Sequence, residues 1–219
     1  MKELNFYFDF LSPFSFFAWK RFEHLELSQK YKINFRPVAL GSLLNHWQIK
    51  GPGEITPKRE FLLKQCLRYA AKNQIEFTTP KTHPFNSLYA LRLSLKSVAR
   101  DDQEKVIKTL WKAGWINRID MGEPEELLKV LKEAQLPAEE LYEKSFSREA
   151  KSELKNNIQE AIGYGVFGVP SFVVDGELFW GNDSVEDLLH FLEGSDYLDR
   201  NKLKLLLDST PRAALQQIT

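Results

Sequence analysis

The 219-residue sequence contains a single cysteine, Cys66, so no disulfide can form within one chain. It also lacks an excess of either charge, because 30 Lys and Arg residues balance 30 Asp and Glu residues. A balanced chain has no electrostatic reason to bind nucleic acid or an acidic membrane. No apolar run approaches the length of a bilayer-spanning helix, and we expect no signal peptide before a strand that starts near Leu4. These absences predict a cytoplasmic protein without nucleic-acid or membrane partners.

Histidines are few, and none of them lies in a recognisable catalytic triad. They are His24, His46, His83 and His190. His46 and His83 each stand alone as expected loop residues, so the sequence predicts no metal site. Cys66 falls within an expected helix, where we interpret it as a core residue. A serine hydrolase and a metalloenzyme are therefore not expected.

Strand and helix patterns alternate at the two ends of the chain, whereas the middle is helical. Short aromatic and β-branched runs predict strands at 4–9, 32–38, 169–174 and 178–180. The last two flank Asp175-Gly176, a hairpin signal. Helices are predicted from Pro13, Pro84 and Pro124, and over 57–73, 101–117, 147–162, 184–192 and 202–207.

This order predicts an α/β fold, a thioredoxin-like domain interrupted by a helical insertion. We expect residues 1–40 and 165–219 to form the discontinuous thioredoxin-like domain. Residues 41–164 are expected to form the inserted helical domain.

Ser12 and Pro13 mark the start of the first helix, with a hydroxyl at the N-cap and a proline at the first helical position. A helix N-terminus favours anions and lowers the pKa of a thiol placed there. Thioredoxin-type redox motifs carry Cys-x-x-Cys at this junction, whereas this chain has serines at both positions, Ser12 and Ser15. If the site binds a thiolate, the sulfur must therefore come from a ligand. An ordinary N-cap serine is the alternative interpretation.

Val169 and Pro170 stand at the entry of the third predicted strand. A cis bond between them would turn the Val169 backbone outward, where it could pair with an extended peptide. The G-x-G-x-x-G pattern of residues 163–168 lies just before them. A helix precedes that pattern and a strand follows it, the reverse of a dinucleotide site, so we reject a nucleotide ligand.

Three segments together carry a resemblance to a known family: residues 6–15, 167–171 and 180–183. The chain resembles the kappa class of glutathione transferases and, within it, the bacterial 2-hydroxychromene-2-carboxylate isomerases. The resemblance spans about residues 4–190 and implies a thioredoxin-like fold, a glutathione site and a homodimer.

The resemblance also implies roles for individual residues. Ser12 would hold the glutathione sulfur as the catalytic residue, Val169 before a cis Pro170 would pair with the cysteinyl backbone, and Trp180 would flank the pocket. The γ-glutamyl end would be held by Asn182, Asp183 and Ser184. Candidates for contacting the substrate are Lys50, Lys58 and Asn86.

The activity that the resemblance implies is a glutathione-dependent cis–trans isomerisation of a small aromatic substrate. The thiolate would add to a conjugated carbon, the resulting single bond would rotate, and elimination would restore the alkene. Two alternatives stay open: a kappa-class transferase, and a non-catalytic thioredoxin-fold binding protein. Ile49 and Gln65 support the second, since relatives often carry asparagine and aspartate there.

Overall fold

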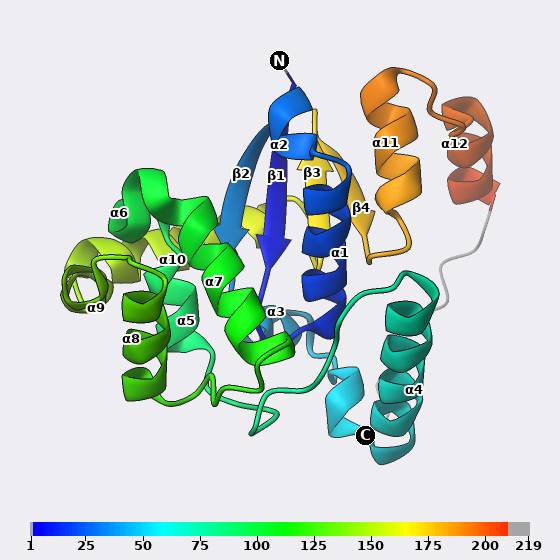
Figure 1. Cartoon of the computed structure of the whole chain (residues 1–219). Coiled ribbons are helices and arrows are strands. Elements are labelled where there is room, and N and C mark those ends of the chain that lie inside the picture. The colour runs from blue at the N-terminus through cyan, green and yellow to red at the C-terminus, as the bar shows by residue number, and fades with distance from the viewer. Residues whose placement is uncertain (1, 210–219) are drawn as a thin grey trace.

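The computed structural model describes residues 2–209 and contains a four-stranded sheet surrounded by helices (Figure 1). The strands are β1 (Glu3–Phe8), β2 (Lys32–Pro37), β3 (Ser171–Val174) and β4 (Glu177–Trp180). Their order is β2-β1-β3-β4, with β2 parallel to β1 and the β1–β3 and β3–β4 pairs antiparallel. The two ends of the chain thus build one sheet, which confirms the predicted thioredoxin-like fold.

Alternation along β1 assigns its side chains to the two faces of the sheet. Leu4, Phe6 and Phe8 are buried in the larger apolar core on one face. Tyr7 is buried in a smaller cluster on the opposite face, with Val173 among its neighbours. A strand buried on both faces reads as a nearly continuous apolar run.

Helices cover both faces of this sheet (Figure 1). On the face of Phe6, α1 (Pro13–His24) contributes Phe22, whose ring centroid lies 5.3 Å from that of Phe6. On the other face, α10 (Arg148–Gly163) binds β1 through Tyr7, whose hydroxyl donates to Glu160 Oε1 at 2.6 Å. This helix falls within the predicted insertion yet packs on the sheet. The domain boundaries stay a prediction.

The remaining helices are mostly short. They are α2 (Leu27–Lys30), α3 (Leu40–Trp47), α4 (Thr56–Lys72), α5 (Leu88–Leu93), α6 (Lys96–Ala99), α7 (Gln103–Trp115), α8 (Pro124–Glu133), α9 (Ala138–Ser145), α11 (Val185–Glu193) and α12 (Arg200–Ser209). Turns of 3-10 helix occur at Pro52–Glu54 and Arg100–Asp102. Between Lys2 and Ser209, no helix is both long and apolar enough to cross a bilayer. The predicted tail beyond residue 209 lies outside the described residues.

One helix prediction was wrong. The helix expected from Pro84 is split into α5 and α6, because the buried Leu95 between them is extended, with φ −70° and ψ 149°. The carboxylate of Glu153 accepts the backbone N–H groups of Lys96 and Ser97 at 3.0 and 2.9 Å. A side chain from α10 therefore caps α6, a contact between distant segments that local spacing does not reveal.

Aromatic side chains of α7 join the helical region to the sheet. The ring centroid of Trp111 lies 5.8 Å from that of Phe8 and 4.6 Å from that of Phe10. Trp115 donates its indole N–H to the backbone oxygen of Phe10 at 2.9 Å. Both tryptophans are almost fully buried. This packing supports the chain segment just before Ser12.

The two tryptophans provide a matched test of this support. We expect Trp115→Phe to lower the free energy of unfolding by about 1–3 kcal/mol more than Trp111→Phe does. Trp115→Phe removes the partner of the Phe10 carbonyl, whereas the Trp111 N–H is buried with no partner among the described residues. Urea unfolding of both variants measures the difference. Equal losses would show that the Phe10–Trp115 hydrogen bond contributes no net stability.

Candidate functional site

Ser12 is the N-cap of α1, as the sequence predicts. Its backbone is extended, and its Oγ accepts the N–H of Ser15 at 3.2 Å. Pro13 occupies the first turn of the helix. The residue is only 6% exposed, so its hydroxyl is held in a largely desolvated position at the positive end of the helix dipole.

Val169 faces Ser12 across the site. The Val169–Pro170 peptide bond is cis, and Ser12 Oγ donates to the Val169 backbone oxygen at 3.3 Å. Because O–H···O hydrogen bonds are usually 2.7–2.8 Å long, this bond is weak and its hydroxyl is easily redirected. The Val169 N–H makes no hydrogen bond to any residue between 2 and 209. The two predicted halves of the site, 157 positions apart, therefore lie side by side.

Asp9 holds the backbone around Ser12 in place, a role that was not predicted from the sequence. Its Oδ1 accepts the Leu11 N–H at 3.0 Å, its Oδ2 accepts the Leu40 N–H at 2.8 Å, and its backbone oxygen accepts the Ser12 N–H at 3.0 Å. Burial raises the pKa of Asp9 to about 6, and the hydrogen bonds to Leu40 and Leu11 oppose that rise. Asp9 thus ties the start of α1 to the start of α3. Its signal in the sequence is a charged residue at the end of an apolar strand.

His83 also reaches the site, although the sequence indicated only an isolated loop residue. Its Nε2 lies 2.9 Å from the Leu11 backbone oxygen, one residue before Ser12. A carbonyl oxygen only accepts, so Nε2 carries the proton, and in the neutral ring Nδ1 is an acceptor. No local pattern identifies this contact, because 71 residues separate the two partners along the chain.

Trp180 is the last residue of β4. Its side chain is 53% exposed, and its ring centroid lies 4.8 Å from that of Phe167. The indole packs on Gly168, where an added Cβ would come within 2.8 Å of Nε1. A side chain at position 168, the residue before Val169, would therefore displace the indole.

Asn182, Asp183 and Ser184 connect β4 to α11, with Ser184 at the N-cap position. Asn182 is 5% exposed, and its Oδ1 is buried without a hydrogen-bond partner within residues 2–209. Ser184 Oγ donates to the Gly181 oxygen at 2.9 Å, and Asp183 is exposed. This turn therefore combines an unpaired buried acceptor with an exposed carboxylate.

The candidate substrate-binding residues are dispersed and exposed. Lys50 follows α3, Lys58 lies in the first turn of α4, and Asn86 precedes α5, where its Oδ1 accepts the Leu88 N–H at 3.2 Å. No hydrogen bond or ion pair of the described residues connects any of them to Ser12. Their roles stay predictions.

Cys66 is confirmed as a core residue, because it is fully buried in α4. Burial raises the pKa of its thiol to about 12, so it is not a thiolate at neutral pH. No cluster of three or more His, Cys, Asp or Glu residues that could hold a metal occurs in the part of the chain that the structure describes. The residues at Ser12 thus offer a helix N-terminus and free backbone groups, and no thiol.

Comparisons with known proteins identify the family of this chain and several of its relatives. Residues 3–193 match the family model of the DSBA-like thioredoxin domain. The chain is 28% identical over 193 residues to a 2-hydroxychromene-2-carboxylate isomerase of Sphingobium xenophagum, a match that covers 87% of this chain and 98% of the relative. It is 27% identical over 212 residues to glutathione S-transferase kappa 1 of Rattus norvegicus, covering 89% and 92%.

Solved structures show the same fold. A 2-hydroxychromene-2-carboxylate isomerase superposes with a TM-score of 0.78 at 23% identity, covering 95% of this chain and 100% of that one. The cytosolic disulfide reductase DsbM of Pseudomonas aeruginosa, solved with GSH, superposes with a TM-score of 0.61 at 15% identity, covering 94% and 99%.

Proposed function

Because this chain belongs to the family of DSBA-like thioredoxin domains, we propose that it is a glutathione-dependent isomerase of the 2-hydroxychromene-2-carboxylate type. The observation that carries the proposal is the contact between Ser12 Oγ and the Val169 backbone oxygen at 3.3 Å. It joins an anion-favouring helix start to the backbone before a cis-proline, where the Val169 N–H has no partner among the described residues and could pair with a peptide. Relatives named as isomerases and as glutathione transferases support the same chemistry.

The absence of cysteine from the site supports a ligand sulfur. Ser12 and Ser15 occupy both positions of a thioredoxin-type dithiol, and Cys66 is buried in α4. The chain therefore cannot cycle between a dithiol and a disulfide at this helix start. A thiol brought by a ligand would meet the same N–H groups and helix dipole that lower thiol pKa values elsewhere.

The residues of the site would have separate roles in this reaction. Bound glutathione would supply a thiolate that adds reversibly to a conjugated carbon. Ser12 would turn its hydroxyl from the Val169 oxygen to donate to the sulfur. This rotation costs little free energy, because the hydrogen bond that it breaks is long and weak. Val169 would align the cysteinyl backbone, and Asn182 and Asp183 would bind the γ-glutamyl ammonium. Holding the sulfur in one place converts its attack into an effectively intramolecular step.

Thermal denaturation with and without glutathione tests the proposal. Glutathione at about 100 times its dissociation constant should stabilise the protein by about 2.7 kcal/mol and raise the melting temperature. Absorbance assays of chromene isomerisation and of chlorodinitrobenzene conjugation then separate an isomerase from a kappa-class transferase. No thermal shift at millimolar glutathione would instead favour the non-catalytic binding protein. Dimerisation and a cytoplasmic location stay predictions.

A further inference from the structure

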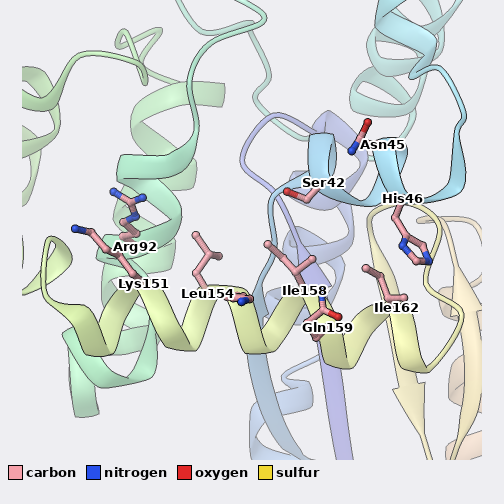
Figure 2. A pocket seen from close by; sticks show the side chains of 10 residues that line it. Ser42, Asn45, His46, Arg92, Lys151, Leu154, Ile158, Gln159 and Ile162 are labelled. Atoms are coloured by element: carbon pink, nitrogen blue, oxygen red, sulfur yellow. The ribbon is translucent and has the colours of Figure 1, made fainter.

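A second candidate binding site is a groove between α3, α5 and α10 (Figure 2). Its volume is about 370 Å³, which is within the range of small-molecule pockets. Leu154, Ile158 and Ile162 line it from α10, one helical turn apart. None of the residues assigned to the glutathione site lines this groove. It is therefore separate from the Ser12 site.

Cationic side chains border this groove without any acidic residue among its lining. Lys151 and Lys155 project from α10 and Arg92 projects from α5, as Figure 2 shows for Lys151 and Arg92. Lys151 and Lys155 are one turn apart on the same helix, an arrangement that is mildly destabilising for like charges. None of these three cations forms an ion pair within residues 2–209. The groove thus keeps uncompensated positive charge.

Two carboxylates of α10, Glu153 and Glu160, are engaged elsewhere. Glu153 accepts the backbone N–H groups at the start of α6, at 3.0 and 2.9 Å. Glu160 accepts the Tyr7 hydroxyl at 2.6 Å and lies 3.7 Å from Arg36 Nε. Neither carboxylate is therefore free to neutralise Lys151 or Lys155.

Arg92 gives a second indication that a counter-charge is missing. Its Nε is buried and has no hydrogen-bond partner among the described residues. A buried N–H without a partner is costly, and the rest of the partly exposed guanidinium can bind an anion through charge-assisted hydrogen bonds. His46, which projects from α3 at the opposite end of the groove, adds another donor near Ile162 (Figure 2).

We propose that this groove binds a small organic anion with an apolar body, independently of the Ser12 site. A carboxylate or sulfonate would lie near Arg92, Lys151 and Lys155. The apolar part would cover Ile158 and Ile162. The inference goes beyond the proposed glutathione chemistry and does not depend on it.

Fluorescence titration with 8-anilinonaphthalene-1-sulfonate tests this site, because that probe combines a sulfonate with an aromatic body. The double variant Lys151→Gln/Lys155→Gln should bind it about tenfold more weakly, and added salt should weaken wild-type binding more than that of the variant. Lys105→Gln/Lys129→Gln removes the same charge from α7 and α8, outside the groove, and should bind as wild type does. Arg92→Gln provides an independent second variant.

Two further measurements distinguish binding of an anion in the groove from binding at the Ser12 site or by apolar contact alone. N-phenyl-1-naphthylamine, which lacks the sulfonate, should bind equally to the double variant and to the wild type. Saturating glutathione should leave binding of the anionic probe unchanged. Equal affinity of the groove variants and the control variant would overturn the proposal, as would displacement of the probe by glutathione. A changed oligomeric state in the groove variants with unchanged probe affinity would assign the groove to a second copy of the chain and also overturn it.

Discussion

Replacing Ser12 by alanine is expected to lower glutathione-dependent turnover by about 100-fold, because one preorganised hydrogen bond to a developing or bound anion is removed. The pKa of the bound glutathione thiol should rise by about 1–2 units, since a hydrogen bond to a charged group contributes about 1.5–3 kcal/mol. Initial rates across pH measure the turnover, and the ultraviolet absorbance of the thiolate measures the pKa.

In this test a loss of stability must be distinguished from a loss of catalysis, because Ser12 is also the N-cap of α1. Alanine at an N-cap costs about 1 kcal/mol, whereas glycine costs only a few tenths. Ser12→Gly should therefore lose turnover as Ser12→Ala does while remaining nearly as stable as the wild type. Ser15→Ala is the matched control, since the Ser15 hydroxyl is buried without a partner among the described residues. Wild-type turnover in both Ser12 variants would refute the assigned role.

The pH dependence of stability should carry a large contribution from Asp9. Burial raises its folded-state pKa to about 6 from the ordinary 3.8, so the folded protein binds more protons between these values. The free energy of unfolding therefore falls as pH rises through this window and stays lower above it. A gap of about 2 pH units corresponds to a loss of about 3 kcal/mol.

Comparison with Asp9→Asn isolates this contribution. Other carboxylates act in the opposite direction, because Lys32 and Lys132 hold the pKa values of Glu3 and Glu139 below their usual range. They titrate alike in both proteins and cancel in the difference. The stability advantage of the wild type over Asp9→Asn should shrink by up to about 3 kcal/mol between about pH 4 and pH 7. A constant difference across that range would show that Asp9 titrates normally.

Asp9→Asn also probes the geometry of the site. Leu11 and Leu40 donate to different oxygens of Asp9, and an asparagine in the same position has an NH2 donor in place of one of them, so it cannot accept from both. One of these backbone N–H groups, now bonded at 3.0 and 2.8 Å, would lose its partner. The segment that carries Ser12 should then be less well positioned.

The two ends of the site could be predicted because each is a local pattern. Ser12-Pro13 indicates a helix start, and Val169-Pro170 before a hairpin indicates a strand entry. The contact between them could not be derived from residue spacing alone, because it requires the sheet order β2-β1-β3-β4. The resemblance to known families supplied that expectation.

His83 shows why other parts of the site escaped prediction. Nothing around it in the chain indicates that its ring contacts the Leu11 carbonyl. The groove of Arg92, Lys151 and Lys155 was missed for the same reason, since its charges come from helices that are distant in the sequence. Charged residues on a helix predict a solvent-exposed face, and the sequence does not show that a neighbouring helix encloses them.

From its residue order alone, this chain is an α/β protein with a serine in place of a cysteine at its first helix. Capping, proline geometry and apolar alternation establish this, because each acts within one turn or one strand. Packing alone joined Ser12 to Val169, buried Asp9 beneath them and split the helix expected from Pro84. Burial and contacts between distant segments depend on how every element fits the others, and no local pattern contains that information.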